Sequence, residues 1–196
     1  MKIIEPSVEL VDDINGEKIL RKLERCGKVS RKSTLGDAES FVRSIIKRGH
    51  ESVLEHVQLT FKIVCDRAIM AELTRHRHAS FTVESTRYVK YDELAVIQPP
   101  LPTADAVIAF RWAIREHERN YQMFIKNGER PEISRAVLPL CLATELYMTA
   151  NLRELRHILK LRTDKAAHPQ MRVVAGKILD ILREKVPVIV EDITSC

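Results

Sequence analysis

The chain has 196 residues, of which 45% are hydrophobic and 30% charged, a composition typical of one globular domain with a sizeable core. Its formal net charge of +5 favours acidic partners, which include nucleotides and nucleic acids. No apolar run is long enough to span a membrane and the start lacks a signal-peptide layout, so we expect a cytoplasmic protein that binds no membrane. The four cysteines lie far apart without a C-x-x-C pair, which argues against a disulfide framework and a thiolate zinc site: Cys26, Cys65, Cys141 and Cys196.

Hydrophobic spacing in the first part of the chain predicts an edge strand, a second strand and the helices between and after them. Residues 1–11 form a short apolar segment, which we expect to be an edge strand. A helix should follow and end near Gly27, and a second helix should begin with Asp37 as its N-cap. Residues 57–66 alternate between apolar and polar side chains as a strand does, and Asp66 should cap the next helix. That helix should end near Arg75, and we expect the chain to continue into a loop.

The second part of the chain predicts three more helices and a strand. Residues 98–102 contain three prolines and should form a loop. Thr103 then caps a long helix, which Gly128 ends. Residues 144–150 have the pattern of a strand, the segment after them that of a helix, and residues 167–186 that of a closing helix. This order of elements predicts an α+β fold, in which an antiparallel or mixed sheet is flanked by long helices.

Residues 75–88 read RHRHASFTVESTRY and concentrate polar chemistry in one short span. The span holds three arginines and no lysine, and the planar, permanently charged arginine fork grips phosphate or carboxylate at two points at once. An arbitrary basic cluster is more often a solvated surface turn, but here residue type and spacing argue for a binding site. Four hydroxyls could complete the hydrogen bonds of a phosphate: Ser80, Thr82, Ser85 and Thr86.

The spacing within this span closely resembles the R-H-R-x-x-S-x-[N/S]-x-x-S-x-R-Y signature of the flavin-dependent thymidylate synthases. The sequence departs from the signature at Thr82, where the family mostly has Asn or Ser, and it has Val83 where Gln or Glu is usual. Thr82 keeps a hydroxyl, whereas any contact at Val83 must use the backbone. The matching residues are Arg75, His76, Arg77, Ser80, Ser85, Arg87 and Tyr88.

Residues 49–56 read GHESVLEH and resemble a second block of that family, which lies against the flavin. By this resemblance Ser52 contacts the cofactor. The spacing is not the H-E-x-x-H of zinc hydrolases, because five residues separate His50 from His56, so we expect no metal. The alternative is that both histidines cap or pack, and for His56 we favour that alternative.

Residues 151–162 hold a third block, in which Arg153 and His157 share one helix face. The segment resembles the family's C-terminal block, where an Asn-x-Arg, a polar residue four positions later and a final Arg complete the flavin and nucleotide sites. His157 stands where the family often has Asn. The alternative is a basic solvated helix face, since Arg156 and Lys160 are present as well.

The resemblance covers most of the chain and implies one domain over residues 1–196 with the fold of this family. It implies a methyltransferase that converts dUMP to dTMP, with 5,10-methylenetetrahydrofolate as the one-carbon donor and NADPH-reduced FAD as the hydride source. The family assembles as homotetramers whose sites several subunits build, and we adopt that state by resemblance.

The resemblance also assigns residues to each ligand. Arg162 would be the catalytic group that stabilises negative charge on the pyrimidine or favours loss of its N3 proton. The residues expected to bind dUMP are Glu72, Leu73, Thr74, Arg75, Val83, Glu84, Ser85, Thr86, Arg87, Arg135 and Arg162. Those expected to bind FAD are Ser52, Arg75, His76, Arg77, Val83, Asn151, Leu152, Arg153 and His157.

A covalent nucleophile has two candidates. Cys141 follows Leu-Pro-Leu, which faintly resembles the Pro-Pro-Cys of the cysteine-dependent thymidylate synthases, but no other block of that family is present. We therefore expect Cys141 to be a buried small side chain. Ser85 has no evident base, and we assign it to binding.

Two alternatives to the synthase remain open at this point. A basic nucleic-acid-binding module without enzymatic activity would suit the charge, but aromatic residues make up only 5% of the chain, few for base stacking. A flavoprotein without synthase activity is the other, because Val83 and His168 depart from the family pattern.

Overall fold

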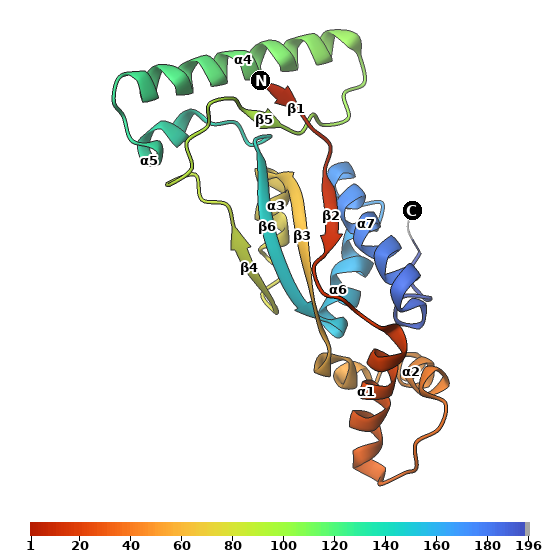
Figure 1. Ribbon diagram of the computed structural model, residues 1–196. Coiled ribbons are helices and arrows are strands. Elements are labelled where there is room, and N and C mark those ends of the chain that lie inside the picture. The colour runs from red at the N-terminus through yellow and green to blue at the C-terminus, as the bar shows by residue number, and fades with distance from the viewer. Residues whose placement is uncertain (195–196) are drawn as a thin grey trace. The chain divides into compact units, whose positions relative to one another are not determined.

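A computed structural model of the protein describes residues 1–194, apart from the side chain of Arg31, so Cys196 lies outside the described residues. Helices and strands are both present in quantity (Figure 1), and the α+β prediction is confirmed. In the part of the chain that is described, none of the helices combines the length and the apolar character needed to cross a membrane.

The described residues form two compact units, each assembled from separate stretches of the chain. Unit 1 comprises residues 1–7, 63–75 and 82–146. Unit 2 comprises residues 8–62 and 76–81, and residue 147 onward. The single domain over residues 1–196 stays a prediction, and the two units are described one at a time.

Unit 1 has its core beneath the long helix α4, Ala104–Lys126. Strands β1, Lys2–Ile3, and β5, Ala95–Val96, pair in parallel, and α4 runs beside them in Figure 1. The Thr103 hydroxyl accepts a hydrogen bond from the Ala106 N–H at 3.2 Å, as the predicted N-cap should. The unit also contains α3, Arg67–Leu73, the short α5, Pro131–Ser134, and the 3-10 helix η3, Arg135–Val137; its buried core is Leu94, Val96, Ile114 and Leu142.

The main sheet has the strand order β2-β3-β6-β4. Strands β3, Gln58–Asp66, and β6, Ala143–Asn151, run antiparallel, because Leu142 faces Arg67 at one end and Leu152 faces Val57 at the other. Alternate side chains of β3 are buried, as its sequence pattern predicts.

Two predictions about strands are wrong. The expected strand over residues 1–11 is broken into β1 and β2, Ser7–Leu10, at Pro6, whose ring nitrogen has no N–H to continue a ladder. The span after Arg75, expected to be a loop, contains strand β4, Ala79–Val83. Its side chains alternate between half-buried and exposed, so Ser80 and Thr82 share the exposed face.

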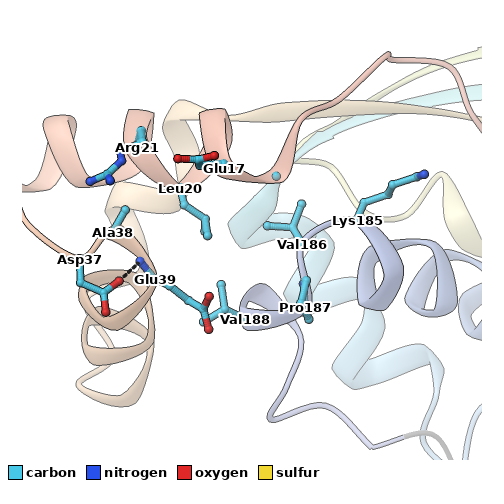
Figure 2. Close-up of a pocket in the computed structure, with 11 residues that line it drawn as sticks. Glu17, Leu20, Arg21, Asp37, Ala38, Glu39, Lys185, Val186, Pro187 and Val188 are labelled. Atoms are coloured by element: carbon cyan, nitrogen blue, oxygen red, sulfur yellow. Dashed lines mark hydrogen bonds between the residues drawn. The ribbon is translucent and has the colours of Figure 1, made fainter.

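Unit 2 is mainly helical. Helices α1, Gly16–Lys28, and α2, Ala38–Lys47, pack together, and α6, Leu152–Arg162, lies beside α7, Pro169–Lys185, in Figure 1. The Asp37 carboxylate accepts a hydrogen bond from the Glu39 N–H at 3.0 Å (Figure 2) and another from the Ser40 N–H at 3.2 Å, which confirms the predicted N-cap. Three 3-10 helices complete the unit: η1, Val29–Arg31, η2, Glu51–His56, and η4, Pro187–Ile189.

The start of α1 requires a glycine. A Cβ atom on Gly16 would collide with the backbone carbonyl oxygen of Lys185 at the end of α7. The absence of a side chain therefore lets the two helix ends approach closely.

A buried arginine joins α6 to two other segments of unit 2. The Arg156 side chain is fully buried, and its Nη2 lies 3.0 Å from Oε1 of Glu51 in η2. Its guanidinium also donates two hydrogen bonds to the Asp192 carboxylate, at 2.7 and 2.9 Å, and one to the Ile189 carbonyl. The hydrogen bond from Arg156 is the main reason that the pKa of Asp192 falls to about 2.

We expect Arg156→Leu to lower the free energy of unfolding by about 3 kcal/mol, because it removes a buried cation from its ion pairs with the carboxylates of Glu51 and Asp192. Urea denaturation at pH 7 measures the change. Arg153→Ala is the matched control on the same helix, because Arg153 pairs with Glu55 of η2 on an exposed surface and its loss should change little. Equal stability of Arg156→Leu and wild type would contradict the anchoring role.

Candidate functional site

A cavity of about 640 Å³ in unit 2 gathers three of the residues expected to bind FAD. They are Asn151, Arg153 and His157, all contributed by the first part of α6 or its N-cap. This size lies within the range of ordinary small-molecule sites. The remaining lining residues are Glu51, Glu55, His78, Glu154 and Lys160.

Local hydrogen bonds fix the α6 side of this cavity. Asn151 is the N-cap, and its Oδ1 accepts the Glu154 N–H at 2.9 Å. Arg153 and His157 lie one turn apart on the exposed side of the helix. Arg153 donates to Oε1 of Glu55 at 2.6 Å, and this hydrogen bond raises the pKa of its guanidinium. The helix thus presents an amide, a guanidinium and an imidazole to one space.

His76 and Arg162 contact each other directly. The Arg162 Nε–H donates to Nε2 of His76 at 3.0 Å, and Nδ1 of His76 lies 3.6 Å from a carboxylate oxygen of Glu154. The His76 ring is 6% exposed and meets the His157 ring edge-on, with centroids 6.0 Å apart. Burial first, and then the charges of Arg162 and His157, lower the pKa of His76 to about 4. His76 is therefore neutral at pH 7.

Ser52 lies at a different cavity from Asn151, Arg153 and His157. It lines a space of about 570 Å³ in unit 2, whose walls include His50 and Arg48. The 3-10 helix η2 turns Glu51 and Glu55 toward the first cavity and Ser52 toward the second. Within one chain, Ser52 therefore lines a different cavity from Asn151, Arg153 and His157.

In unit 1 the signature continues as a turn after β4. The Ser85 carbonyl accepts the N–H groups of Tyr88 and Val89 at 3.1 and 3.0 Å, and its Oγ accepts the Arg87 N–H at 3.3 Å. Ser85 therefore shapes the turn through its carbonyl oxygen and its hydroxyl oxygen. The exposed Arg87 guanidinium lies 5.6 Å from the centre of the Tyr88 ring and 3.5 Å from Glu132.

Glu84 ties this turn to the rest of unit 1. Its Oε1 accepts the Tyr91 hydroxyl at 2.5 Å, and its backbone N–H donates to the Glu145 carbonyl at 2.9 Å. Burial, followed by the bond to Glu84, raises the pKa of Tyr91. The amide of Gln122 in α4 donates to the Tyr91 carbonyl at 2.7 Å, which joins the turn to the long helix.

The other predicted residues divide by exposure. Leu73 and Leu152 have buried side chains, so a ligand contact at either must use the backbone. Thr86 is also buried, whereas Val83 and Glu72 are half-buried. Three predicted arginines have exposed side chains, and one threonine is partly exposed: Arg75, Arg77, Arg135 and Thr74.

Four residues that line the first cavity were not predicted as site residues from the sequence: Glu154 and Lys160 of α6, and Glu51 and Glu55 of η2. A signal was available for the two glutamates of η2, because they stand four positions apart in the quoted GHESVLEH block. His78, the fifth residue missed, follows the Arg-His-Arg triplet directly. Tyr91, which holds Glu84, carried no comparable signal.

Cys141 has the environment of a packing residue. It packs against the buried core of unit 1, and burial raises the pKa of its thiol to about 11. A nucleophilic cysteine needs the opposite shift. Cys65 is more deeply buried, and burial raises its pKa to about 12.

A further cavity of about 360 Å³ lies among α1, the start of α2 and the end of α7 (Figure 2). It contains none of the predicted site residues, and Leu20 and Val186 are among its apolar walls. Within residues 1–194, no group of three or more His, Cys, Asp and Glu side chains is arranged to hold a metal ion.

Comparison with known proteins places these features in a family context. The family model described as thymidylate synthase complementing protein, Thy1, matches residues 9–188. The chain is 34% identical over 170 residues to a probable flavin-dependent thymidylate synthase of Mycobacterium phage L5, covering 79% of this chain and 70% of that protein. It is 37% identical over 150 residues to the flavin-dependent thymidylate synthase of Thermococcus onnurineus, covering 73% of this chain but only 61% of that longer protein.

A solved structure resembles the whole chain. The UMP/dUMP methylase PolB from Streptomyces cacaoi, bound with 5-Br dUMP, superposes with a TM-score of 0.84 at 26% identity, covering 97% of this chain and 96% of that chain. The same methylase bound with 5-Br UMP gives a TM-score of 0.83.

The neutral buried state of His76 predicts acid lability. In the unfolded chain His76 takes up a proton near pH 6.5, whereas in the folded protein it does so only near pH 4. The contribution of His76 to the free energy of unfolding is therefore fully present above pH 6.5 and is lost as the pH falls toward 4. The loss due to His76 should reach about 3 kcal/mol, at about 1.4 kcal/mol per pKa unit. Urea unfolding of wild type and His76→Gln between pH 7 and 4 measures it, and equal slopes for the two proteins would contradict the assignment.

Proposed function

The chain belongs to the flavin-dependent thymidylate synthase family, and we propose that it converts dUMP to dTMP by reductive methylation. The one-carbon donor is 5,10-methylenetetrahydrofolate, and NADPH-reduced FAD is the hydride source. The protein is a methyltransferase, as family membership and the methylase of the same fold indicate. The observation that carries the proposal is the Arg162 guanidinium, which is hydrogen-bonded to a neutral His76 from the family signature.

The donor set of the first cavity fits FAD. Asn151, Arg153 and His157 supply hydrogen-bond donors of the kind that flavin carbonyls and phosphates accept. Two of the carboxylates at the same cavity have basic partners, since Glu55 pairs with Arg153 and Glu51 with Arg156. When bound, FAD supplies the redox chemistry, and the protein holds and orients it.

Arg162 acts on the pyrimidine in this proposal. Making C5 of dUMP a nucleophile builds negative charge on the ring, and a permanent cation at the ring edge stabilises that charge. The arginine keeps its charge at every physiological pH. His76 adds an acceptor beside it without adding a competing negative charge.

The nucleotide phosphate needs other groups. Arg75, Arg87 and Arg135 are exposed guanidinium forks in unit 1, which suit bidentate contact with phosphate oxygens. The turn at Ser85, anchored through Glu84, gives Arg87 a defined backbone position. These assignments follow from the family pattern and from the exposure of the side chains.

Membership of an enzyme family replaces the alternative of a nucleic-acid-binding module. The alternative of a flavoprotein without synthase activity is separated from the proposal by experiment. Such a protein would be yellow and would form no dTMP.

We expect purified protein to release FAD on denaturation and to form dTMP from dUMP, 5,10-methylenetetrahydrofolate and NADPH. Arg162→Ala should abolish dTMP formation, because it removes the cation that stabilises negative charge on the pyrimidine. The variant should still bind FAD, because the residues expected to bind the flavin are unchanged. Product chromatography and flavin absorbance are the two measurements. A yellow wild-type protein that makes no dTMP would refute the proposal.

Cys141→Ala is the control variant for that experiment. It removes a packing side chain without touching the proposed site, so most activity should survive. A folded but inactive Cys141→Ala would revive a covalent mechanism. UMP is run as a second substrate, because the methylase PolB, which shares the fold, is described as acting on both UMP and dUMP.

We also infer a homotetramer with sites built by several subunits, located in the cytoplasm. The separate cavities of Ser52 and of Asn151 support shared sites, since one chain presents flavin-binding side chains in two places. Light scattering on the purified protein should give four times the 22.5 kDa chain mass. A monomeric mass with full activity would contradict the inference.

A further inference from the structure

The side chain of Arg162 is held by a contact within unit 2 that the family signature does not itself explain. We propose that His76 is a positioning residue for Arg162, whose Nε–H it accepts, and that Glu154 holds the His76 ring in the required tautomer. The inference rests on the proposed function, in which Arg162 acts on the pyrimidine. It gives His76 a task that differs from the flavin contact expected from the resemblance.

The chemistry of arginine fixes the tautomer. A guanidinium N–H can only donate, so Nε2 of His76, 3.0 Å from Nε of Arg162, must carry the lone pair. The proton of the neutral ring is then on Nδ1. The Glu154 carboxylate faces Nδ1 at 3.6 Å, too far for a hydrogen bond but close enough to favour a proton there.

Both contacts come from one helix. Glu154 is in the first turn of α6 and Arg162 is its last residue, eight positions or about 12 Å further along the axis. The long arginine side chain can lean back toward the start of the helix, where side chains of a helix point. His76 and Glu154 are 6% and 8% exposed, so the surrounding packing fixes them. The buried His76 ring is therefore a fixed acceptor that restrains the flexible Arg162 side chain.

This restraint has a catalytic consequence. An arginine loses side-chain entropy when it is ordered, and an acceptor that is already in place lowers that cost at the moment of reaction. A displacement of about 1 Å in a catalytic group can cost about 10²-fold in rate. The contact should therefore act on kcat more than on the KM for dUMP.

Three substitutions at His76 form the first test. His76→Gln keeps an acceptor near the Nε2 position, whereas the shorter His76→Asn places its amide near Nδ1, and His76→Phe keeps the ring shape without an acceptor. We expect His76→Gln to retain most of the wild-type kcat, and the other two to lose about 10²-fold with little change in KM. All rates are measured at saturating FAD, with FAD affinity determined separately. A loss that follows FAD affinity alone, or an equal loss in all three variants, would overturn the proposal.

A double-mutant cycle provides the second test. Lysine has no Nε–H in the position used by Arg162, so Arg162→Lys already removes the contact. If His76 acts through Arg162, adding His76→Phe to Arg162→Lys should cause little further loss of kcat. Additive losses would show that His76 acts elsewhere. Glu154→Gln keeps an oxygen that faces Nδ1 of His76, so its kcat should be higher than that of Glu154→Leu.

The third test needs no activity and thus separates this inference from the proposed function. Ring-¹⁵N correlation spectra of the ligand-free protein at pH 7 report the tautomer of each histidine, and His76→Gln identifies the His76 signal. We expect a protonated Nδ1 and an unprotonated Nε2. A proton on Nε2 would overturn the inference even in an active enzyme, and the expected tautomer in a protein that makes no dTMP would refute only the function.

Discussion

The buried charge of Arg156 is the constraint on which the architecture of unit 2 depends. Its guanidinium joins α6 to η2 through Glu51 and to the segment that carries Asp192. A buried cation without its partners would be very costly, so these three segments keep one arrangement. Because α6 is fixed from its buried side, its opposite side can offer Arg153 and His157 to a cavity.

Two arginines of α6 thus show two uses of the same side chain. Arg156 has charged partners and is fully buried, which suits a structural role. Arg162, six residues later, donates to the neutral imidazole of the buried His76. This acceptor orients the guanidinium, which suits the catalytic role proposed for Arg162.

Local rules in the sequence were sufficient for the caps at Asp37, Asp66 and Thr103, because each cap depends on a side chain and the next few N–H groups. They failed at β4, where hydroxyl side chains on the exposed face concealed the alternation of a strand. The signature and the C-terminal block predicted that His76 and Arg162 belong to the site, but their contact joins residues 86 positions apart. The burial of Arg156 was equally invisible, since in the sequence it reads as part of a basic helix face.

The separation of Ser52 from Asn151 follows from geometry that no spacing rule contains. In η2, Glu51 and Glu55 line the cavity beside α6, whereas Ser52, next to Glu51 in the chain, lines another cavity. Spacing along a 3-10 helix does not predict this division, because Ser52 and Glu55 are three positions apart and would share a face at three residues per turn. Because Ser52 and Asn151 line separate cavities of one chain, the arrangement suits the proposed assembly, in which several subunits build each flavin site.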